Sequence, residues 1–119
     1  RKVHIPRAKA ILSRQQILKH PAVLLHELAH SYHDQILDFN HPQIKQAYER
    51  AMAAGKYKEV LLYTGKTVKH YGTTNEKEFF AEGTEAYFYR NDFFPFVAAE
   101  LELYDPFFFS VLEEIWGKL

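Results

Sequence analysis

The chain has 119 residues, of which 47% are hydrophobic and 25% charged, and its formal net charge is zero. This balance is ordinary for one globular domain, and it provides neither a basic surface for nucleic acid nor an acidic tail. There is no cysteine, so neither disulfides nor thiolate ligands are available. No apolar run approaches the length that spans a membrane. We therefore expect a single domain over residues 1–119.

The first half of the chain predicts a short extended piece followed by two helices. Residues 3–6 are typical of an extended segment, and residues 13–20 of a polar connection. A proline suited to a first helical position starts a long predicted helix, which runs from 21 to about 39. A second helix is predicted over 42–54, and the following Gly55 suits its carboxyl-terminal end.

The second half predicts a small β element and further helices. Residues 59–63 and 67–71 flank a Thr-Gly-Lys turn, which indicates a β-hairpin. A third helix is expected over 76–90 and a last one over 106–117, with some helical turns in the aromatic stretch 93–103. The expected fold class is therefore α+β and mainly α.

The first long helix carries the sequence His26-Glu27-Leu28-Ala29-His30, the HExxH pattern of zinc peptidases. Residues four apart lie on one face of a helix, so His26 and His30 can both reach one metal ion. Glu27 would then sit beside the open position of the metal, where it can take a proton from water. The pattern predicts one zinc ion, two of its ligands and a general base.

Two histidines and a glutamate could instead form a solvated helix face. The surrounding residues argue against this, because the rest of the helix is apolar and indicates burial, and buried polar side chains need partners. The apolar neighbours are Ala22, Val23, Leu24, Leu25, Leu28 and Ala29.

A catalytic zinc usually has a third protein ligand. His33 follows His30 by one helical turn, but it would lie further along the helix axis, and a polar supporting or rim position suits it better. The metzincin pattern requires a glycine at 33 and a histidine at 36, so His33 and Ile36 exclude that class.

Three carboxylates in the third helix are better candidates. Glu78, Glu82 and Glu85 are spaced at i, i+4 and i+7 and share one helix face, where they repel one another unless a cation or donors compensate. The alternative is that Glu78 closes a capping box with Asn75, while the other two are solvated.

The run Tyr71 to Glu82, YGTTNEKEFFAE, resembles the catalytic segment of the anthrax lethal factor family of zinc metalloproteases. Clostridial Pro-Pro endopeptidases look like relatives with the same arrangement. The resemblance covers mainly residues 22–36 and 71–88. It implies a gluzincin-type peptidase acting on a peptide or protein substrate, with a zincin-like catalytic domain. It is also compatible with an extracytoplasmic location.

The resemblance implies a role for each matched residue. His26, His30 and Glu78 would be the zinc ligands, and Glu27 the general base. The Tyr71 hydroxyl would stabilise the oxyanion, and Glu82 would orient a ligand histidine. From spacing alone, Tyr71 could equally be a strand-end aromatic residue packing on the core.

Three points stay open at this level. The family domain has several strands before its HExxH helix, whereas residues 1–25 leave room for one, so the chain is either a compact member or lacks an amino-terminal sheet. The aromatic residues after 92 either pack in the core or form an exposed patch.

The alternatives to a peptidase are a catalytically silent binding or regulatory module of the same fold, and a structural zinc domain, which the absence of cysteine disfavours.

Overall fold

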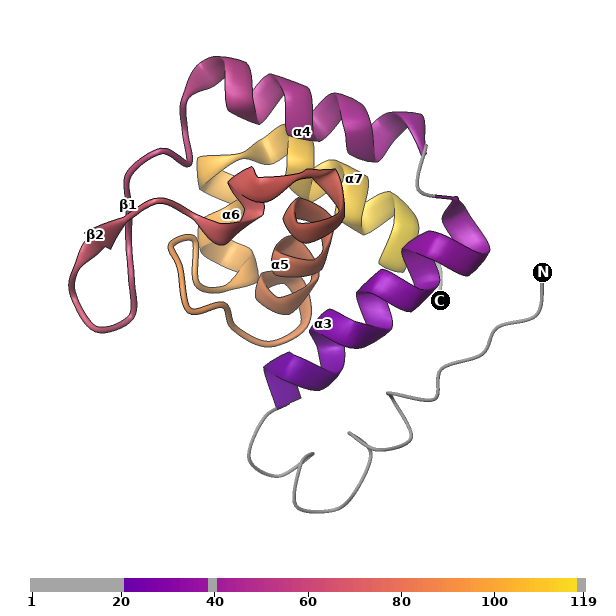
Figure 1. The fold of residues 1–119 in the computed structure, drawn as a ribbon, viewed down its shortest axis with the longest axis horizontal. Coiled ribbons are helices and arrows are strands. Elements are labelled where there is room, and N and C mark those ends of the chain that lie inside the picture. The colour runs from indigo at the N-terminus through magenta and orange to yellow at the C-terminus, as the bar shows by residue number, and fades with distance from the viewer. Residues whose placement is uncertain (1–20, 39–40, 118–119) are drawn as a thin grey trace.

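The computed structural model describes residues 21–38 and 41–117 (Figure 1). This part of the chain forms a small α+β domain that is mainly helical, as expected. The predicted extended piece at 3–6 and the connection at 13–20 lie outside the described residues. In chain order the elements are α3 (Pro21–Tyr32), the π-helical turn η1 (His33–Leu37), α4 (Pro42–Ala54), β1 (Val60–Leu61), β2 (Thr67–Val68), the 3-10 turn η2 (Tyr71–Thr74), α5 (Glu76–Phe88), α6 (Ala98–Tyr104) and α7 (Pro106–Trp116).

Helix α5 is the centre of the fold. It contacts α3, α4, α6, α7 and η2, and every residue from Phe79 to Ala86 is buried. In Figure 1 the other helices surround it, with α3 crossing one side. A helix that is buried on all sides needs apolar residues around its whole circumference, and any polar residue on it must find a partner inside the protein.

Helix α7 packs directly onto the backbone of α5. The rings of Phe79 and Phe108 stack with centroids 4.0 Å apart. A Cβ atom at Gly83 would come within 2.3 Å of the Phe108 ring, so only glycine permits this approach. The contact holds α5 against the core at Gly83, which lies between the two buried glutamates Glu82 and Glu85.

The predicted first helix starts at Pro21 as expected, but its end differs from the prediction. The α-helical part stops at Tyr32, and the π-helical turn η1 follows to Leu37. Asp38, with φ of 73°, then turns the chain out of the helix. A π turn closes its hydrogen bonds one residue further along the chain, and apolar periodicity cannot distinguish it from the end of an α-helix.

The other helix boundaries follow their capping residues. Helix α4 spans Pro42–Ala54 as predicted, and Gly55 ends it in the left-handed conformation with φ of 69°. Helix α5 begins after Asn75, whose side chain accepts a hydrogen bond from the backbone N–H of Glu78. It ends at Phe88, two residues earlier than predicted.

The β-hairpin is present but much shorter than predicted. β1 and β2 pair antiparallel over two residues each, with Val60 opposite Val68 and Leu61 opposite Thr67. The prediction that the second strand reaches Tyr71 is wrong, because the chain enters the 3-10 turn η2 at that residue. His70 caps this turn by accepting a 2.8 Å hydrogen bond from the backbone N–H of Gly72, which breaks the strand.

All the aromatic residues after 92 except Phe96 pack in or against the core, which supports the first of the two interpretations for them. Phe108 is buried, while others pack partly buried around it. These partly buried residues are Phe93, Phe94, Tyr104, Phe107, Phe109 and Trp116. The side chain of Asp105 starts α7 by accepting from the N–H of Phe108, and it also accepts the hydroxyl of buried Tyr57 at 2.9 Å.

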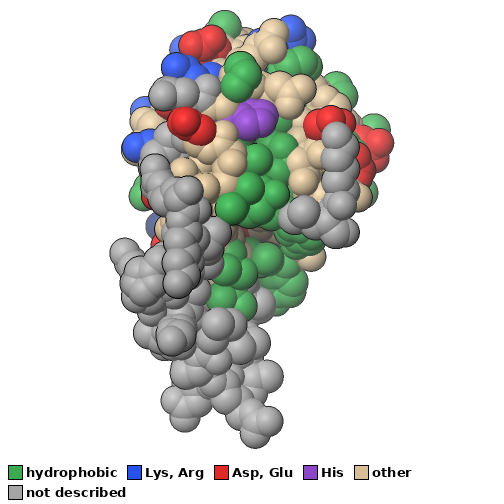
Figure 2. All heavy atoms as spheres, turned by 90° about the vertical axis from the view of Figure 1, so that its right-hand side faces the viewer, with side chains coloured by type: hydrophobic (Ala, Val, Ile, Leu, Met, Phe, Trp, Pro, Cys, Tyr) green, Lys and Arg blue, Asp and Glu red, His purple; other side chains and the backbone are tan. Residues whose placement is uncertain are grey.

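Some apolar surface remains exposed among the described residues. Figure 2 shows hydrophobic side chains gathered on one face, with acidic side chains on either side of them. Exposed apolar residues occur on several elements, including Val23 on α3, Ile36 on η1 and Phe88 on α5. In the part of the chain that the structure describes, no helix has both the length and the apolar character to cross a membrane.

Candidate metal centre

Two helices bring three potential ligands to one point. Helix α3 presents His26 and His30 on one face, and their Nε2 atoms lie 3.2 Å apart. Helix α5 presents Glu78 between them, with Oε1 2.9 Å from Nε2 of His26 and Oε2 3.2 Å from Nε2 of His30. The candidate metal centre is therefore formed by residues 52 and 48 positions apart in the sequence, and it exists only because α3 packs against α5.

The donor atoms fit a zinc ion in kind and in spacing. A tetrahedral zinc with bonds of about 2.1 Å to nitrogen and oxygen keeps its ligand atoms about 3.4 Å apart. The three separations of 2.9 to 3.2 Å are close to this value. All three side chains are partly buried, with 20%, 23% and 19% of the His26, His30 and Glu78 side chains exposed, so the centre can be reached from solvent.

Two buried carboxylates hold the other nitrogen of His26. Its Nδ1 lies 2.6 Å from Oε2 of Glu85 and 3.1 Å from Oε2 of Glu82. The two glutamates are 8% and 6% exposed, respectively. A carboxylate on the second nitrogen of a ligand histidine fixes the ring orientation and directs the lone pair of Nε2 towards the metal.

The charges of this cluster are strongly coupled. Burial alone would lower the pKa of His26, but the carboxylates of Glu82 and Glu85 outweigh burial and raise this pKa to about 10. Burial raises the pKa of Glu85 to about 8, although His26 opposes the rise. Burial also acts to raise the pKa of Glu82, but its interactions with His26 and Glu85 outweigh burial and lower that pKa. Of the two carboxyls, Glu82 therefore holds a negative charge more readily.

Glu27 and Tyr71 are the remaining predicted site residues. Glu27 directly follows His26 on α3 and is partly buried. Tyr71, the first residue of η2, is 48% exposed, and its ring centroid lies 6.5 Å from that of His26. Its position on the exposed rim shows that it is not a core aromatic residue.

His33 does not take part in the candidate metal centre. It is fully buried, and its ring meets the Phe80 ring edge to face with centroids 5.0 Å apart. Burial, together with nearby positive groups, lowers its pKa to about 4. A rim position for His33 is therefore excluded. Two groups of the described residues have the spacing to hold a metal: one is His26, His30 and Glu78, and the other is His26, Glu82 and Glu85.

The structure changes the reading of the glutamate stripe. The alternative in which Glu82 and Glu85 are solvated is wrong, since both are buried. The capping contact from Glu78 to Asn75 exists through its backbone, while its carboxylate is directed to the two histidines. The sequence predicts no ligand-orienting role for Glu85, because its i+7 spacing from Glu78 indicates only which helix face it shares and not which imidazole atom it contacts.

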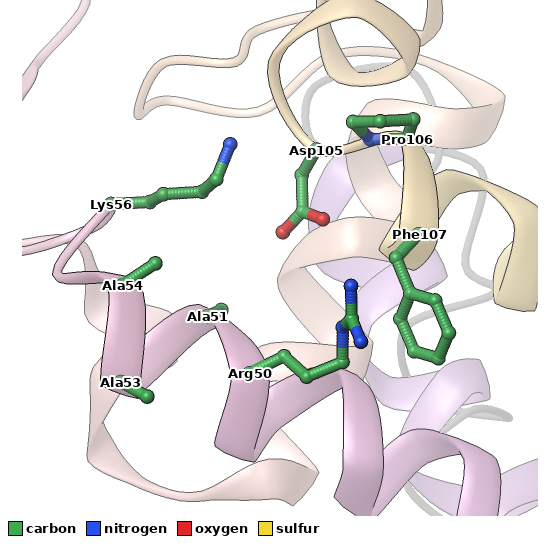
Figure 3. A pocket seen from close by; sticks show the side chains of 8 residues that line it. All are labelled: Arg50, Ala51, Ala53, Ala54, Lys56, Asp105, Pro106 and Phe107. Atoms are coloured by element: carbon green, nitrogen blue, oxygen red, sulfur yellow. The ribbon is translucent and has the colours of Figure 1, made fainter.

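A separate hollow lies away from this cluster. A cavity of about 530 Å³ opens between the end of α4 and the start of α7 (Figure 3). The guanidinium of Arg50 lies 4.3 Å from the centroid of the Phe107 ring, and Asp105 is engaged by Tyr57 and by the α7 backbone. The Lys56 ammonium donates to the backbone carbonyl of Tyr104, so each charged group of the lining has a partner in the protein, and no histidine lines the cavity.

Comparison with protein-family models, with curated proteins and with solved structures found no match for this chain.

Proposed function

We propose that this protein is a zinc-dependent endopeptidase with a zincin-like catalytic domain. The observation that carries this proposal is the convergence of His26 Nε2, His30 Nε2 and the Glu78 carboxylate within one coordination sphere. Two imidazoles and one carboxylate are the ligand set of catalytic zinc sites that keep an open fourth position, whereas closed structural sites rely mostly on cysteine.

Each protein side chain has a specific task in this reaction. Zinc, when bound, would polarise the scissile carbonyl and lower the pKa of water towards about 7. Glu27 would take a proton from the attacking water and pass it to the leaving amine. The Tyr71 hydroxyl would donate a hydrogen bond to the carbonyl oxygen as it gains negative charge.

The position of Tyr71 supports this assignment. An oxyanion donor must be accessible to a peptide and must lie near the ligands, and Tyr71 is half exposed with its ring 6.5 Å from that of His26. The 3-10 turn that carries it leads directly into α5, which carries Glu78. The resemblance of this segment to the lethal factor family supports the same arrangement, since that family pairs a tyrosine with a glutamate seven residues later.

Zinc content is the first test. The native chain should bind one zinc ion, and Glu78→Ala should bind it far more weakly while keeping its circular dichroism spectrum. Glu76→Ala is the matched control, because it removes a carboxylate from the same helical turn without touching the cluster, and it should bind zinc like the native chain. A folded native chain that binds no zinc would refute the metal centre.

Cleavage of a fluorogenic peptide library separates the enzyme from a silent module. The zinc-loaded native chain should cleave peptides, a chelator should stop cleavage, and Glu27→Gln should keep its zinc but lose turnover by about 100-fold or more. A zinc-loaded chain that cleaves no member of the library would favour the silent binding module. Unchanged turnover in Glu27→Gln would remove Glu27 from the mechanism.

A further inference from the structure

Two buried carboxylates approach the same nitrogen of His26, although an imidazole bound through Nε2 has one proton to donate from Nδ1. Glu85 is the nearer, at 2.6 Å, and its contact meets the geometry of a hydrogen bond. The Glu82 oxygen lies 3.1 Å away, within ion-pair distance. The two acceptors are therefore not equivalent.

We propose that Glu85 is the positioning residue of the metal centre, and that it orients His26 by accepting the hydrogen bond from Nδ1–H. This role depends on the zinc site proposed above and adds to it a residue that the sequence resemblance does not assign. The resemblance gives the orienting task to Glu82, whereas the shorter contact in the structure belongs to Glu85.

The packing of α5 makes Glu85 suited to this task. It lies in the run of buried residues, and α7 packs against the helix backbone at Gly83, two residues before it. A side chain on such an immobilised stretch can hold a ring more precisely than one on a loop. His26, by contrast, belongs to a helix whose side chains are mostly half-buried, so its ring needs an external constraint.

Glu82 has a different set of neighbours. Its backbone carbonyl accepts a hydrogen bond from the side chain of Asn91, and its carboxylate interacts with both His26 and Glu85. The negative charge of Glu82 therefore acts on both His26 and Glu85. Removing Glu82 should leave the Glu85 hydrogen bond in place, whereas removing Glu85 should leave Nδ1 with the longer contact only.

Three variants test this assignment: Glu85→Ala, Glu85→Gln and Glu82→Ala. Zinc affinity is measured by competition with a chromogenic chelator, and folding is checked by circular dichroism. Glu85→Ala should weaken zinc binding by about 10-fold or more, within the range known for orienting partners of ligand histidines. Glu85→Gln keeps an oxygen at the same reach and should restore affinity to within a few-fold of native. Glu82→Ala, the matched buried control, should lose less than Glu85→Ala.

A spectroscopic measurement adds a readout that packing alone would not change. In the zinc-loaded protein, the proton NMR signal of His26 Nδ1–H should be lost or shifted in Glu85→Ala and retained in Glu85→Gln. The visible spectrum of the cobalt-substituted protein, which reports the ligand geometry, should likewise change in Glu85→Ala and stay close to native in Glu85→Gln.

Several results would overturn the assignment. Native-like affinity in Glu85→Ala, or a larger loss in Glu82→Ala, would give the role to Glu82. Two zinc ions per native chain, with one lost in Glu85→Ala, would mean that Nδ1 carries a metal and not a proton. A native chain without zinc affinity would refute the metal centre itself, which separates that failure from a failure confined to Glu85.

Discussion

Helices α3 and α5 supply the two halves of the candidate metal centre, but the protein holds them in very different ways. On α5 every residue from Phe79 to Ala86 is buried, whereas among residues 22–32 of α3 Ala29 alone is buried. The carboxylates thus stand on a helix enclosed by its neighbours, and the histidines on a helix that packs on α5 but stays half-buried along most of its length. The difference indicates that the contacts at the site, and a metal when bound there, contribute more to the placement of α3 than of α5.

The largest effect on stability is expected from disrupting the buried stretch of α5. Phe80 on α5 is fully buried, so Phe80→Ala should lower the free energy of unfolding by about 3–5 kcal/mol. Phe88→Ala makes the same change on the same helix at a residue that is 50% exposed, and it should cost much less. Urea unfolding measures the loss of stability in both variants, and equal losses would contradict the deep burial of Phe80.

The exposed rim of the site is tested by Tyr71→Phe, which removes one hydroxyl. Turnover should fall by about 100-fold, or roughly 3 kcal/mol of barrier, with little change in KM, because the hydroxyl acts on charge that develops in the transition state. Tyr63→Phe, at a 69% exposed tyrosine of the hairpin, is the control and should have no effect. An unchanged kcat in Tyr71→Phe would exclude the oxyanion role.

Acid should weaken the turn that leads into α5. His70 is 4% exposed, and burial lowers its pKa from 6.5 to about 4. The folded protein therefore favours neutral His70, so its contribution is complete above pH 6.5 and is lost as the pH falls from 6.5 towards 4. The loss should reach on the order of 3 kcal/mol, at about 1.36 kcal/mol per pKa unit.

This acid effect can be isolated by His70→Asn, which keeps a side-chain acceptor for the N–H of Gly72 but does not titrate. Urea unfolding at pH 7 and pH 5 should show a smaller difference for the variant than for the native chain. His33, whose pKa is also lowered to about 4, should leave part of the dependence in place. An identical pH difference in both chains would show that His70 is not the source.

Zinc binding should stabilise α3 more than α5. At a free zinc concentration of 100 times Kd, the folded state gains about 2.7 kcal/mol. Amide hydrogen exchange should slow most along α3, since its amides open locally, while those of α5 already require larger openings. Glu78→Ala should abolish the change, and equal slowing of both helices would contradict the proposed difference in anchoring.

The smallest effect concerns the start of α5. The Asn75 side chain accepts a 2.9 Å hydrogen bond from the backbone N–H of Glu78, so Asn75→Ala should cost about 1 kcal/mol. Asn75→Asp keeps the cap and should retain most of the stability. Because the cap sits one turn before the proposed ligand Glu78, zinc affinity should also fall slightly in Asn75→Ala; a rise would be inconsistent with this role.

Local signals in the sequence were sufficient for most helix boundaries. Pro21, Pro42 and Pro106 each start a helix because proline fixes φ, and Gly55 ends one because glycine, without a Cβ, readily adopts the left-handed conformation. The hairpin and the end of the first helix were less predictable. β2 ends at Val68, before His70 caps the 3-10 turn η2, and the π turn η1 appears where an apolar pattern alone indicates continued α-helix.

The sequence by itself determined which residues share a helix face, because helical spacing depends on neighbours three and four positions apart. It thus indicated His26 with His30, and the carboxylate stripe at Glu78, Glu82 and Glu85. Only the tertiary structure decided how the two faces meet, because α3 and α5 pack together through residues far apart in the sequence, while α7 packs on α5 at Gly83 within the buried stretch from Phe79 to Ala86. The packing of α3 against α5 directs Glu78 to the Nε2 atoms and places Glu85 closest to the Nδ1 of His26.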